Sequence, residues 1–185
     1  FENRYNPDNV MPIARWISMD TALSDTESSA YSAAVIGELT PDYHMRIVDC
    51  WAERVQLPQL VTITSNLAGH YKGNDTLRGI IIEQKASGFS LIQTLRQSSE
   101  EWLSKIILPY TPKFSKEIRW SEAAVWCSLG CIQLPNPSDK HIWLYDFEQD
   151  LFEAPNIPFK DRLDAFAQLV LFTENLLSEG YRARK

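Results

Sequence analysis

RWISMDTALSDTESSAYSAAVIGE, residues 15–38, decides how we interpret the rest of the chain. The stretch opens with the apolar run Trp16 to Met19, which is typical of a buried strand, and this run ends at Asp20. Residues 22–29 are rich in Ser, Thr and Asp, which favour a turn, and an apolar run resumes from Tyr31 to Leu39 as a second strand. A carboxylate at the end of a buried strand is unfavourable unless something stabilises it, so Asp20 needs a physical reason.

The rest of the chain predicts one α/β domain. A third strand, Met45 to Val55, completes an antiparallel meander, and Leu77 to Glu83 has the continuous apolar character of a central strand. Periodicity and capping signals predict helices at 56–72, 89–107, 115–129 and 160–177. Short strands are expected at 108–111 and, at an edge of the sheet, at 132–134. Residues 142–152 form a segment of mixed character. This order predicts a mixed central sheet flanked by helices, as in a ribonuclease H-like fold, with residues 1–12 as a leader or the end of a linker and residues 13–185 as the domain.

Composition narrows the class of protein. The 185 residues, 44% of them hydrophobic, suffice for one domain with its own core. The apolar runs fall well short of the roughly 20 residues of a membrane span, so we expect a soluble protein. The net charge of −6 argues against a surface that binds nucleic acid throughout, but it allows a local basic groove. Three cysteines form no disulfide framework and favour a reducing cytoplasm, and we expect Cys127 and Cys131 to be buried thiols because no histidine completes a zinc pattern.

Three further acids occupy positions comparable to that of Asp20. Glu83 ends the apolar run 79–82, and Asp161 and Asp164 open the last helix, where residues three apart share a face. Phosphodiester hydrolysis by two metal ions requires several converging carboxylates, whose oxygens suit Mg²⁺ or Mn²⁺. Taken singly, three of the acids have another explanation: a turn cap for Asp20, a solvent-facing strand end for Glu83, and the positive end of a helix for Asp161. Asp164 is harder to explain in this way, because it lies beside the apolar face of the last helix. Together they predict a site for two Mg²⁺ or Mn²⁺ ions.

Basic and hydroxyl side chains near these acids are candidate contacts for the phosphates of double-stranded DNA. Such contacts position a duplex without reading its sequence. Any single lysine is more simply explained as a solvated surface charge, and Lys85 is the strongest candidate because it follows Glu83 in a strand-end loop. Asp25, Thr26 and Ser29 either line the site or make turn hydrogen bonds, and we favour the turn. The predicted DNA contacts are Lys85, Ser87, Lys113, Lys116, Arg119, Lys160 and Arg162.

Six segments, taken together, are specific to one family. They are WISMDTALSDTESSAYSAAVIGE, RIVDCWAERV, IIIEQKASGFSLIQTL, PYTPKFSKEIRWSEAAVW, WLYDFEQDLFEAP and FKDRLDAFAQLVLF. On these segments the chain resembles the C-terminal nuclease domain of the large terminase subunit of tailed bacteriophages and prophages, over essentially its whole length. The resemblance implies a ribonuclease H-like fold and metal-dependent endonuclease cleavage of concatemeric viral DNA during genome packaging, in the host bacterial cytoplasm.

The resemblance also implies which residues and partners take part. It places the family's acids on Asp20, on Glu83, and on the pair Asp161 and Asp164. Relatives often carry two adjacent acids, after His, where this chain has Lys160-Asp161-Arg162, so the principal ligand is open between Asp161 and Asp164. The implied partners are an N-terminal ATPase domain of the same full-length chain, the portal and the small terminase subunit. No G-x-x-x-x-G-K-[ST] phosphate loop occurs here, so this piece is not expected to hydrolyse ATP.

Two other functions remain open at this point. The same fold can serve a non-catalytic module that docks a motor or portal partner, or another ribonuclease H-like enzyme such as a resolvase, exonuclease or transposase. A docking module predicts scattered acids and no metal-dependent nicking. The enzymes are distinguished from one another by their action on linear and branched DNA.

Overall fold

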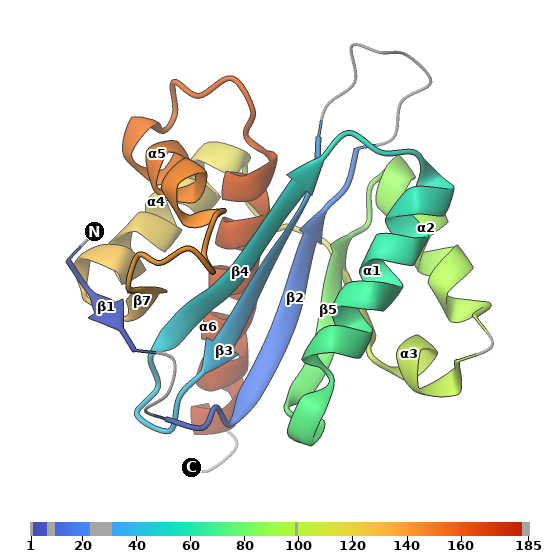
Figure 1. Cartoon of the computed structure of the whole chain (residues 1–185), viewed down its shortest axis with the longest axis horizontal. Helices are drawn as coiled ribbons and strands as arrows, with labels where there is room; N and C mark the ends of the chain where they lie inside the picture. The colour runs from blue at the N-terminus through green and yellow to red at the C-terminus, as the bar shows by residue number, and fades with distance from the viewer. Residues whose placement is uncertain (1, 7–9, 23–30, 99, 183–185) are drawn as a thin grey trace.

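Seven strands form one mixed sheet that carries helices on both faces (Figure 1). The structure is a computed structural model and describes residues 2–6, 10–22, 31–98 and 100–182. The strands are β1 (Arg4–Tyr5), β2 (Ala14–Asp20), β3 (Ser32–Leu39), β4 (Met45–Glu53), β5 (Leu77–Glu83), β6 (Ile107–Tyr110) and β7 (Ile132–Pro135). The helices are α1 (Leu57–Tyr71), a 3-10 turn η1 (Gly73–Asp75), α2 (Ala86–Arg96), α3 (Glu101–Lys105), α4 (Lys116–Ser128), α5 (Leu144–Glu153) and α6 (Asp161–Arg182). The sheet order is β1-β7-β4-β3-β2-β5-β6, which confirms the predicted mixed α/β class.

The directions of the central strands bring two of the predicted acids to one edge of the sheet. β2, β3 and β4 form the expected antiparallel meander, whereas β5 and β6 run parallel to β2. The register pairs Met19 of β2 with Ile82 of β5, so the next residues, Asp20 and Glu83, end neighbouring strands. Carboxyl ends of parallel strands are where α/β sheets commonly bind ligands.

Side-chain alternation decides which face of the sheet these acids occupy. Met19 packs into the core on the α1 and α2 side, whereas Trp16 packs into the core on the α6 side. Ser18 also faces α6, because Gln168 of that helix donates a hydrogen bond to its Oγ atom (3.0 Å). Asp20, two residues further along β2, therefore points to the α6 face.

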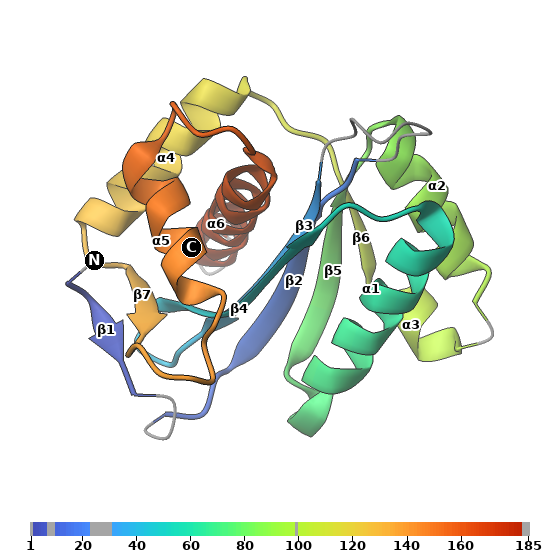
Figure 2. The same cartoon turned by 45° about the horizontal axis from the view of Figure 1, so that its top comes forward.

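β5 repeats this arrangement. Ile80 and Ile82 belong to the core on the α1 and α2 side, and Ile81 belongs to the core on the α6 side. The same alternation turns Glu83 toward the α6 face. Figure 2 shows α4, α5 and α6 on one side of the sheet and α1, α2 and α3 on the other. Asp20 and Glu83 thus share both an edge and a face of the sheet.

The helix expected at 89–107 is wrong in its extent. The structure has α2, α3 and the strand β6 in this region. Polar residues from Gln97 onward interrupt the apolar pattern, and the Oγ atom of Ser98 accepts a hydrogen bond from the backbone N–H of Glu100 (3.2 Å). Ile107 then pairs with Ile80 of β5, because a β-branched residue suits a strand beside another strand better than a helix end.

Several smaller expectations also change. The mixed segment at 142–152 contains the helix α5, and β7 is not an edge strand because β1 pairs outside it. Within residues 1–12, expected as a leader or the end of a linker, Arg4–Tyr5 forms β1, and the Tyr5 hydroxyl donates a hydrogen bond to the carbonyl of Ile47 (3.0 Å). Cys127 and Cys131 are half-buried rather than buried. Within the described residues, no helix has both the length and the apolar character that crossing a membrane requires.

Candidate active site

The carboxylates of Asp20 and Glu83 are buried in the fold. Asp20 is 3% exposed and Glu83 is 6% exposed. Their strands hydrogen-bond to each other, so neither backbone can move without disturbing the sheet. Buried carboxylates are unfavourable unless cations or hydrogen-bond donors stabilise them, so the surroundings of these two side chains show what the site is built to hold.

The Lys85 ammonium group joins the two carboxylates. Its Nζ atom donates a hydrogen bond to Oδ1 of Asp20 (2.7 Å) and lies 3.4 Å from Oε2 of Glu83. Lys85 immediately precedes α2, whose first turn lies against the end of β5. A Cβ atom on Gly88 would lie only 2.0 Å from the carbonyl oxygen of Glu83, so only glycine permits this approach. Gly88 thereby keeps Lys85 beside the strand end.

The first turn of α6 supplies two further acids. Asp164 is 1% exposed, and Asp161 is partly exposed. The indole N–H of Trp120 donates a hydrogen bond to Oδ1 of Asp164 (2.9 Å), and the ammonium of Lys116 donates one to Oδ2. Both donors come from α4, so packing of α4 against α6 decides the orientation of this carboxylate.

Gln168 fixes α6 over the junction of β2 and β5. It lies one turn after Asp164, and its side-chain NH₂ group donates to Oγ of Ser18 (3.0 Å) and to the carbonyls of Met19 (3.3 Å) and Ile81 (3.2 Å). All of these groups are buried, which makes the contacts stronger than they would be in water. The start of α6 is therefore held above the strand ends that carry the other acids.

One carboxylate oxygen at this site lacks a hydrogen-bond donor. Among the described residues, Oε2 of Glu83 has no hydrogen-bond partner, although Lys85 lies at ion-pair distance. The buried Arg119 guanidinium has its Nη1 atom 3.6 Å from the same oxygen, and its Nε and Nη1 atoms also lack partners in this part of the structure. Buried polar atoms without a hydrogen-bond partner are rare in folded proteins, and an ordered water or a bound ion is one explanation for them.

The acids and lysines of the site shift one another's pKa values. Burial raises the pKa of Asp20 to about 6, and the nearby Asp164 carboxylate adds to this rise while Lys85 and Lys116 oppose it. Burial also raises the pKa of Asp161, where Asp164 again adds to the rise and the two lysines oppose it. For Lys85, burial acts to lower the pKa, but Asp20, together with the other acids, raises it above its ordinary value. The charges of these groups therefore respond to one another.

The donor set fits a hard divalent cation, although it is not arranged as a ready-made cage. Over the described residues, no group of three or more His, Cys, Asp or Glu side chains is placed to hold an ion. The Asp20 and Asp164 carboxylates each accept a hydrogen bond from a lysine. Oxygen donors of carboxylates are what Mg²⁺ and Mn²⁺ prefer, and Oε2 of Glu83, which accepts no hydrogen bond among the described residues, can bind one. Asp20, Glu83, Asp164 and Asp161 are therefore the residues that could hold metal.

The remaining predicted DNA contacts fall into two groups. Lys113 and Lys160 are exposed, and the Lys160 ammonium lies 5.3 Å above the Trp120 ring. The Ser87 hydroxyl donates to the carbonyl of Thr21 (2.7 Å), which ties the end of β2 to α2. The two arginines are engaged inside the protein instead. Arg119 lies buried beside Glu83, and Arg162 pairs with Asp150 (2.7 Å) and Asp146 (3.5 Å) of α5. Asp25, Thr26 and Ser29 lie outside the described residues.

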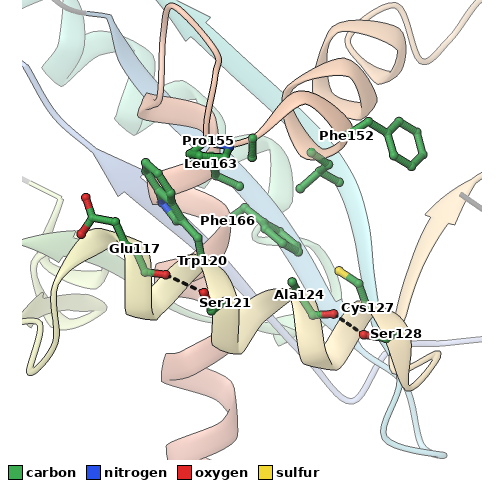
Figure 3. A pocket seen from close by; sticks show the side chains of 12 residues that line it. Glu117, Trp120, Ser121, Ala124, Cys127, Ser128, Phe152, Pro155, Leu163 and Phe166 are labelled. Carbon is green, nitrogen blue, oxygen red and sulfur yellow. Dashed lines mark hydrogen bonds between the residues drawn. The ribbon is translucent and has the colours of Figure 1, made fainter.

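A cavity of about 560 Å³ adjoins the site between α4, α5 and α6 (Figure 3). Its lining is largely apolar and includes Leu163 and Phe166 of α6 and Phe152 of α5. The Ser121 and Ser128 hydroxyls at its α4 wall donate to carbonyls within that helix, as the dashed lines show. Trp120 contributes to both the cavity and the acidic site, because its ring lines the cavity and its N–H donates a hydrogen bond to Asp164.

Trp120, Gln168 and Gly88 were not among the predicted site residues. Gln168 had a signal in the sequence, because it is a polar residue four positions after Asp164 on an otherwise apolar helix face. Gly88 lies in the small-residue run Ala86-Ser87-Gly88 soon after a buried strand, and a glycine there is consistent with a close backbone approach. Trp120 had no such signal, since a tryptophan on a helix is more often simply part of the core.

Comparisons with known proteins identify the fold. No family model matches the sequence, and no curated protein matches it. The human cytomegalovirus terminase nuclease domain, soaked with manganese and bound to an inhibitor, has a TM-score of 0.61 and 12% identity, covering 92% of this chain and 89% of that chain. A second structure of that domain gives a TM-score of 0.61, 13% identity, and coverage of 91% and 88%. The fowlpox virus resolvase in complex with Holliday junction DNA gives a TM-score of 0.46 and 12% identity, covering 88% of this chain and 99% of that chain. The chain therefore has the ribonuclease H-like fold seen in a terminase nuclease domain.

Proposed function

We propose that this chain is the metal-dependent endonuclease domain of a phage DNA-packaging terminase, which cuts concatemeric double-stranded viral DNA. The observation that carries the proposal is the pair of buried carboxylates, Asp20 and Glu83, which end neighbouring strands and share one ammonium group. The fold likeness to the cytomegalovirus terminase nuclease domain, one structure of which was soaked with manganese, supports the same conclusion. The sequence resemblance described above adds the phage family.

Two ions, Mg²⁺ or Mn²⁺, would be held by Asp20, Glu83, Asp161 and Asp164. When bound, such ions supply Lewis-acid stabilisation of the phosphate and an activated water for in-line attack. Between the two acids of α6, we infer that Asp164 is the principal ligand, because it is the more deeply buried and acts on the pKa of Asp20. Asp161 completes the set from the more exposed side.

The protein's part in the reaction is to hold these oxygens in place before DNA arrives. Asp20 and Glu83 are fixed by the pairing of β2 with β5, and Asp164 is oriented by Trp120. Gln168 sets the distance between α6 and the strands. Groups held in this way in a water-poor site need little rearrangement during the reaction, which is the main source of electrostatic catalysis.

The DNA would lie over the exposed side of this edge. The proposed phosphate contacts are Lys85, Lys116, Lys113, Lys160 and Ser87. Lys85 and Lys116 pair with acids but have side chains that are 35% and 43% exposed, whereas the side chains of Arg119 and Arg162 are 3% and 22% exposed. Such contacts do not read sequence. Because the whole chain carries a net charge of −6, we expect weak DNA binding that falls steeply as salt concentration rises.

The packaging role extends this proposal to partners. An N-terminal ATPase domain of the same full-length chain, the portal and the small terminase subunit would bring concatemeric DNA to the site in the host bacterial cytoplasm. Sequence resemblance is the support for these partners. Co-purification of the full-length chain with the portal and the small subunit, compared with this domain alone, tests that extension.

The test of the activity is incubation of supercoiled plasmid with Mg²⁺, Mn²⁺ or a chelator. We expect the domain to convert supercoiled DNA to open-circular and linear forms with a divalent ion and to do nothing in the chelator. Asp20→Asn keeps the size of the side chain but removes its charge, and it should abolish cleavage while the protein stays folded. Full activity in this variant would overturn the assignment of Asp20.

The plasmid assay separates a docking module from the enzymes, and the same incubations with linear and branched DNA separate the enzymes from one another. A folded wild-type domain that never nicks DNA with either metal would favour a non-catalytic docking module. Preferential cleavage of four-way junctions over linear duplex would favour a resolvase, and degradation only from ends would favour an exonuclease. Strand joining rather than hydrolysis would favour a transposase.

A further inference from the structure

The Lys85 ammonium group lies in the position that a cation shared by Asp20 and Glu83 would occupy. Its Nζ atom is 2.7 Å from one carboxylate and 3.4 Å from the other. Lysines beside acids usually form surface ion pairs that contribute little. Here the two acid side chains are 4% and 8% exposed, so the ammonium neutralises charge that the fold has buried. Without it, Asp20 would be a buried charge close to a second acid, Asp164.

The two sides of this ion pair differ in their freedom to move. Asp20 ends a strand that is paired on both sides, to β3 and to β5. The Lys85 side chain is 35% exposed and extends from the turn between β5 and α2 on a flexible four-carbon chain. When the ion pair breaks, the lysine can move into solvent while the carboxylate stays.

The same arrangement occurs a second time on α6. Lys116 binds Asp164, and the lysine side chain is 43% exposed whereas the acid side chain is 1% exposed. Trp120 also donates to Asp164, so this carboxylate keeps its orientation when the lysine leaves. Two buried acids of the site are thus each bound by the ammonium group of a partly exposed lysine.

We propose that Lys85 is the built-in counter-ion of the metal-free site and that a divalent cation must displace it from Asp20. The inference rests on the proposed metal-dependent function. Mg²⁺ needs oxygen ligands at about 2.0–2.1 Å, and the Oδ1 atom that faces the site already accepts the lysine hydrogen bond. Two cations a few ångströms apart in a water-poor site also repel each other strongly.

This exchange has two consequences. In the absence of metal, Lys85 stabilises the fold; in the presence of metal, its departure lowers the apparent metal affinity. The displaced ammonium remains tethered beside the site, where the phosphates of DNA are the anions that it can bind next. Metal loading would therefore make the Lys85 phosphate contact available.

The test compares Mn²⁺ affinity, measured by titration calorimetry without DNA, for the wild type, Lys85→Met and Lys160→Met. Both variants lose one positive charge near the acids, but the Lys160 ammonium lies over the Trp120 ring rather than on Asp20. We expect Lys85→Met to bind Mn²⁺ about tenfold more tightly than the wild type, because the competing charged hydrogen bond is gone. Lys160→Met should change the affinity by less than about threefold, since an exposed charge is screened.

Thermal unfolding of the same proteins gives a second readout and shows whether they are folded. In chelator, Lys85→Met should unfold at a lower temperature than the wild type, and saturating Mn²⁺ should remove this difference. If Lys85→Met does not fold without metal, NMR of the wild-type protein provides the test instead. The ammonium ¹⁵N–¹H signal of Lys85 should then be visible in chelator and should shift toward that of a free lysine when Mg²⁺ is added.

The outcomes separate this inference from the function on which it rests. Equal or weaker Mn²⁺ binding by Lys85→Met, beside a wild type that binds, overturns the counter-ion role and leaves the metal site intact. An ammonium signal unmoved by saturating Mg²⁺ does the same. Absence of Mn²⁺ binding in both proteins overturns the metal site and the inference together.

Discussion

Replacement of Trp120 by phenylalanine should destabilise the domain through a single lost hydrogen bond. The indole N–H donates to Oδ1 of Asp164 (2.9 Å), and both residues are buried. Phenylalanine keeps most of the ring packing but leaves this oxygen with one donor fewer. Hydrogen bonds to charged groups contribute about 1.5–3 kcal/mol, so we expect a loss of about 2 kcal/mol. For a domain of this size that corresponds to an unfolding temperature lower by about 4–8 °C.

Trp102→Phe is the matched control. The Trp102 indole also donates to a carboxylate, Oε2 of Glu100 (2.7 Å), but this bond is exposed to solvent. Water replaces the lost donor there, so the expected loss is below about 0.5 kcal/mol. Both variants are unfolded by urea in chelator, so that bound metal does not add to the stability. Equal losses in the two variants would refute the inference that Trp120 supports a buried, charged Asp164.

Three further changes test the placement of the acids. Gly88→Ala should destabilise the domain by about 1–3 kcal/mol and weaken Mn²⁺ binding, because its Cβ would lie 2.0 Å from the Glu83 carbonyl oxygen; unchanged urea and calorimetric titrations would contradict the close approach. Gln168→Leu removes an NH₂ group whose two hydrogens are shared among three buried acceptors, and it should lower the free energy of unfolding by about 1–3 kcal/mol; an unchanged urea midpoint would show that α6 is not held there. The folded-state pKa of Asp20, about 6, lies above its ordinary value of 3.8, so the folded, metal-free domain binds a proton that the unfolded chain releases. Stability should therefore fall as pH rises from about 4 to about 6, and Asp20→Asn should lose this part of the slope in urea titrations.

Local sequence patterns predict which edge of the sheet carries the site. Apolar runs that end in an acid at Asp20 and at Glu83 are visible in the sequence, and the two strands are parallel neighbours in the structure. Period-two alternation then places both acids on the same face of the sheet, and the structure shows that α6 covers this face. The helical spacing of Asp161 and Asp164 likewise predicts their shared turn. These features depend on residues close together in the chain.

The contacts that complete the site depend on residues far apart in the chain. Lys85 was predicted to contact phosphate, and the structure shows its ammonium on Asp20, 65 positions away. Arg119 was predicted to contact DNA, and the structure places it buried beside Glu83. Such pairings are decided by how helices pack over the sheet, which no local period encodes. The start of β6 at Ile107, inside the helix expected at 89–107, was missed for a similar reason, because the pairing of β6 with β5 outweighs local helix propensity.

The most direct measurement of the central claim is the position of Mn²⁺ in crystals of the domain soaked with MnCl₂, located by anomalous scattering. We expect manganese between the carboxylates of Asp20, Glu83 and Asp164, at about 2.0–2.2 Å from their oxygens, with the Lys85 ammonium moved away from Asp20. Manganese bound elsewhere, or an empty site with Lys85 still on Asp20 at saturating Mn²⁺, would contradict the claim.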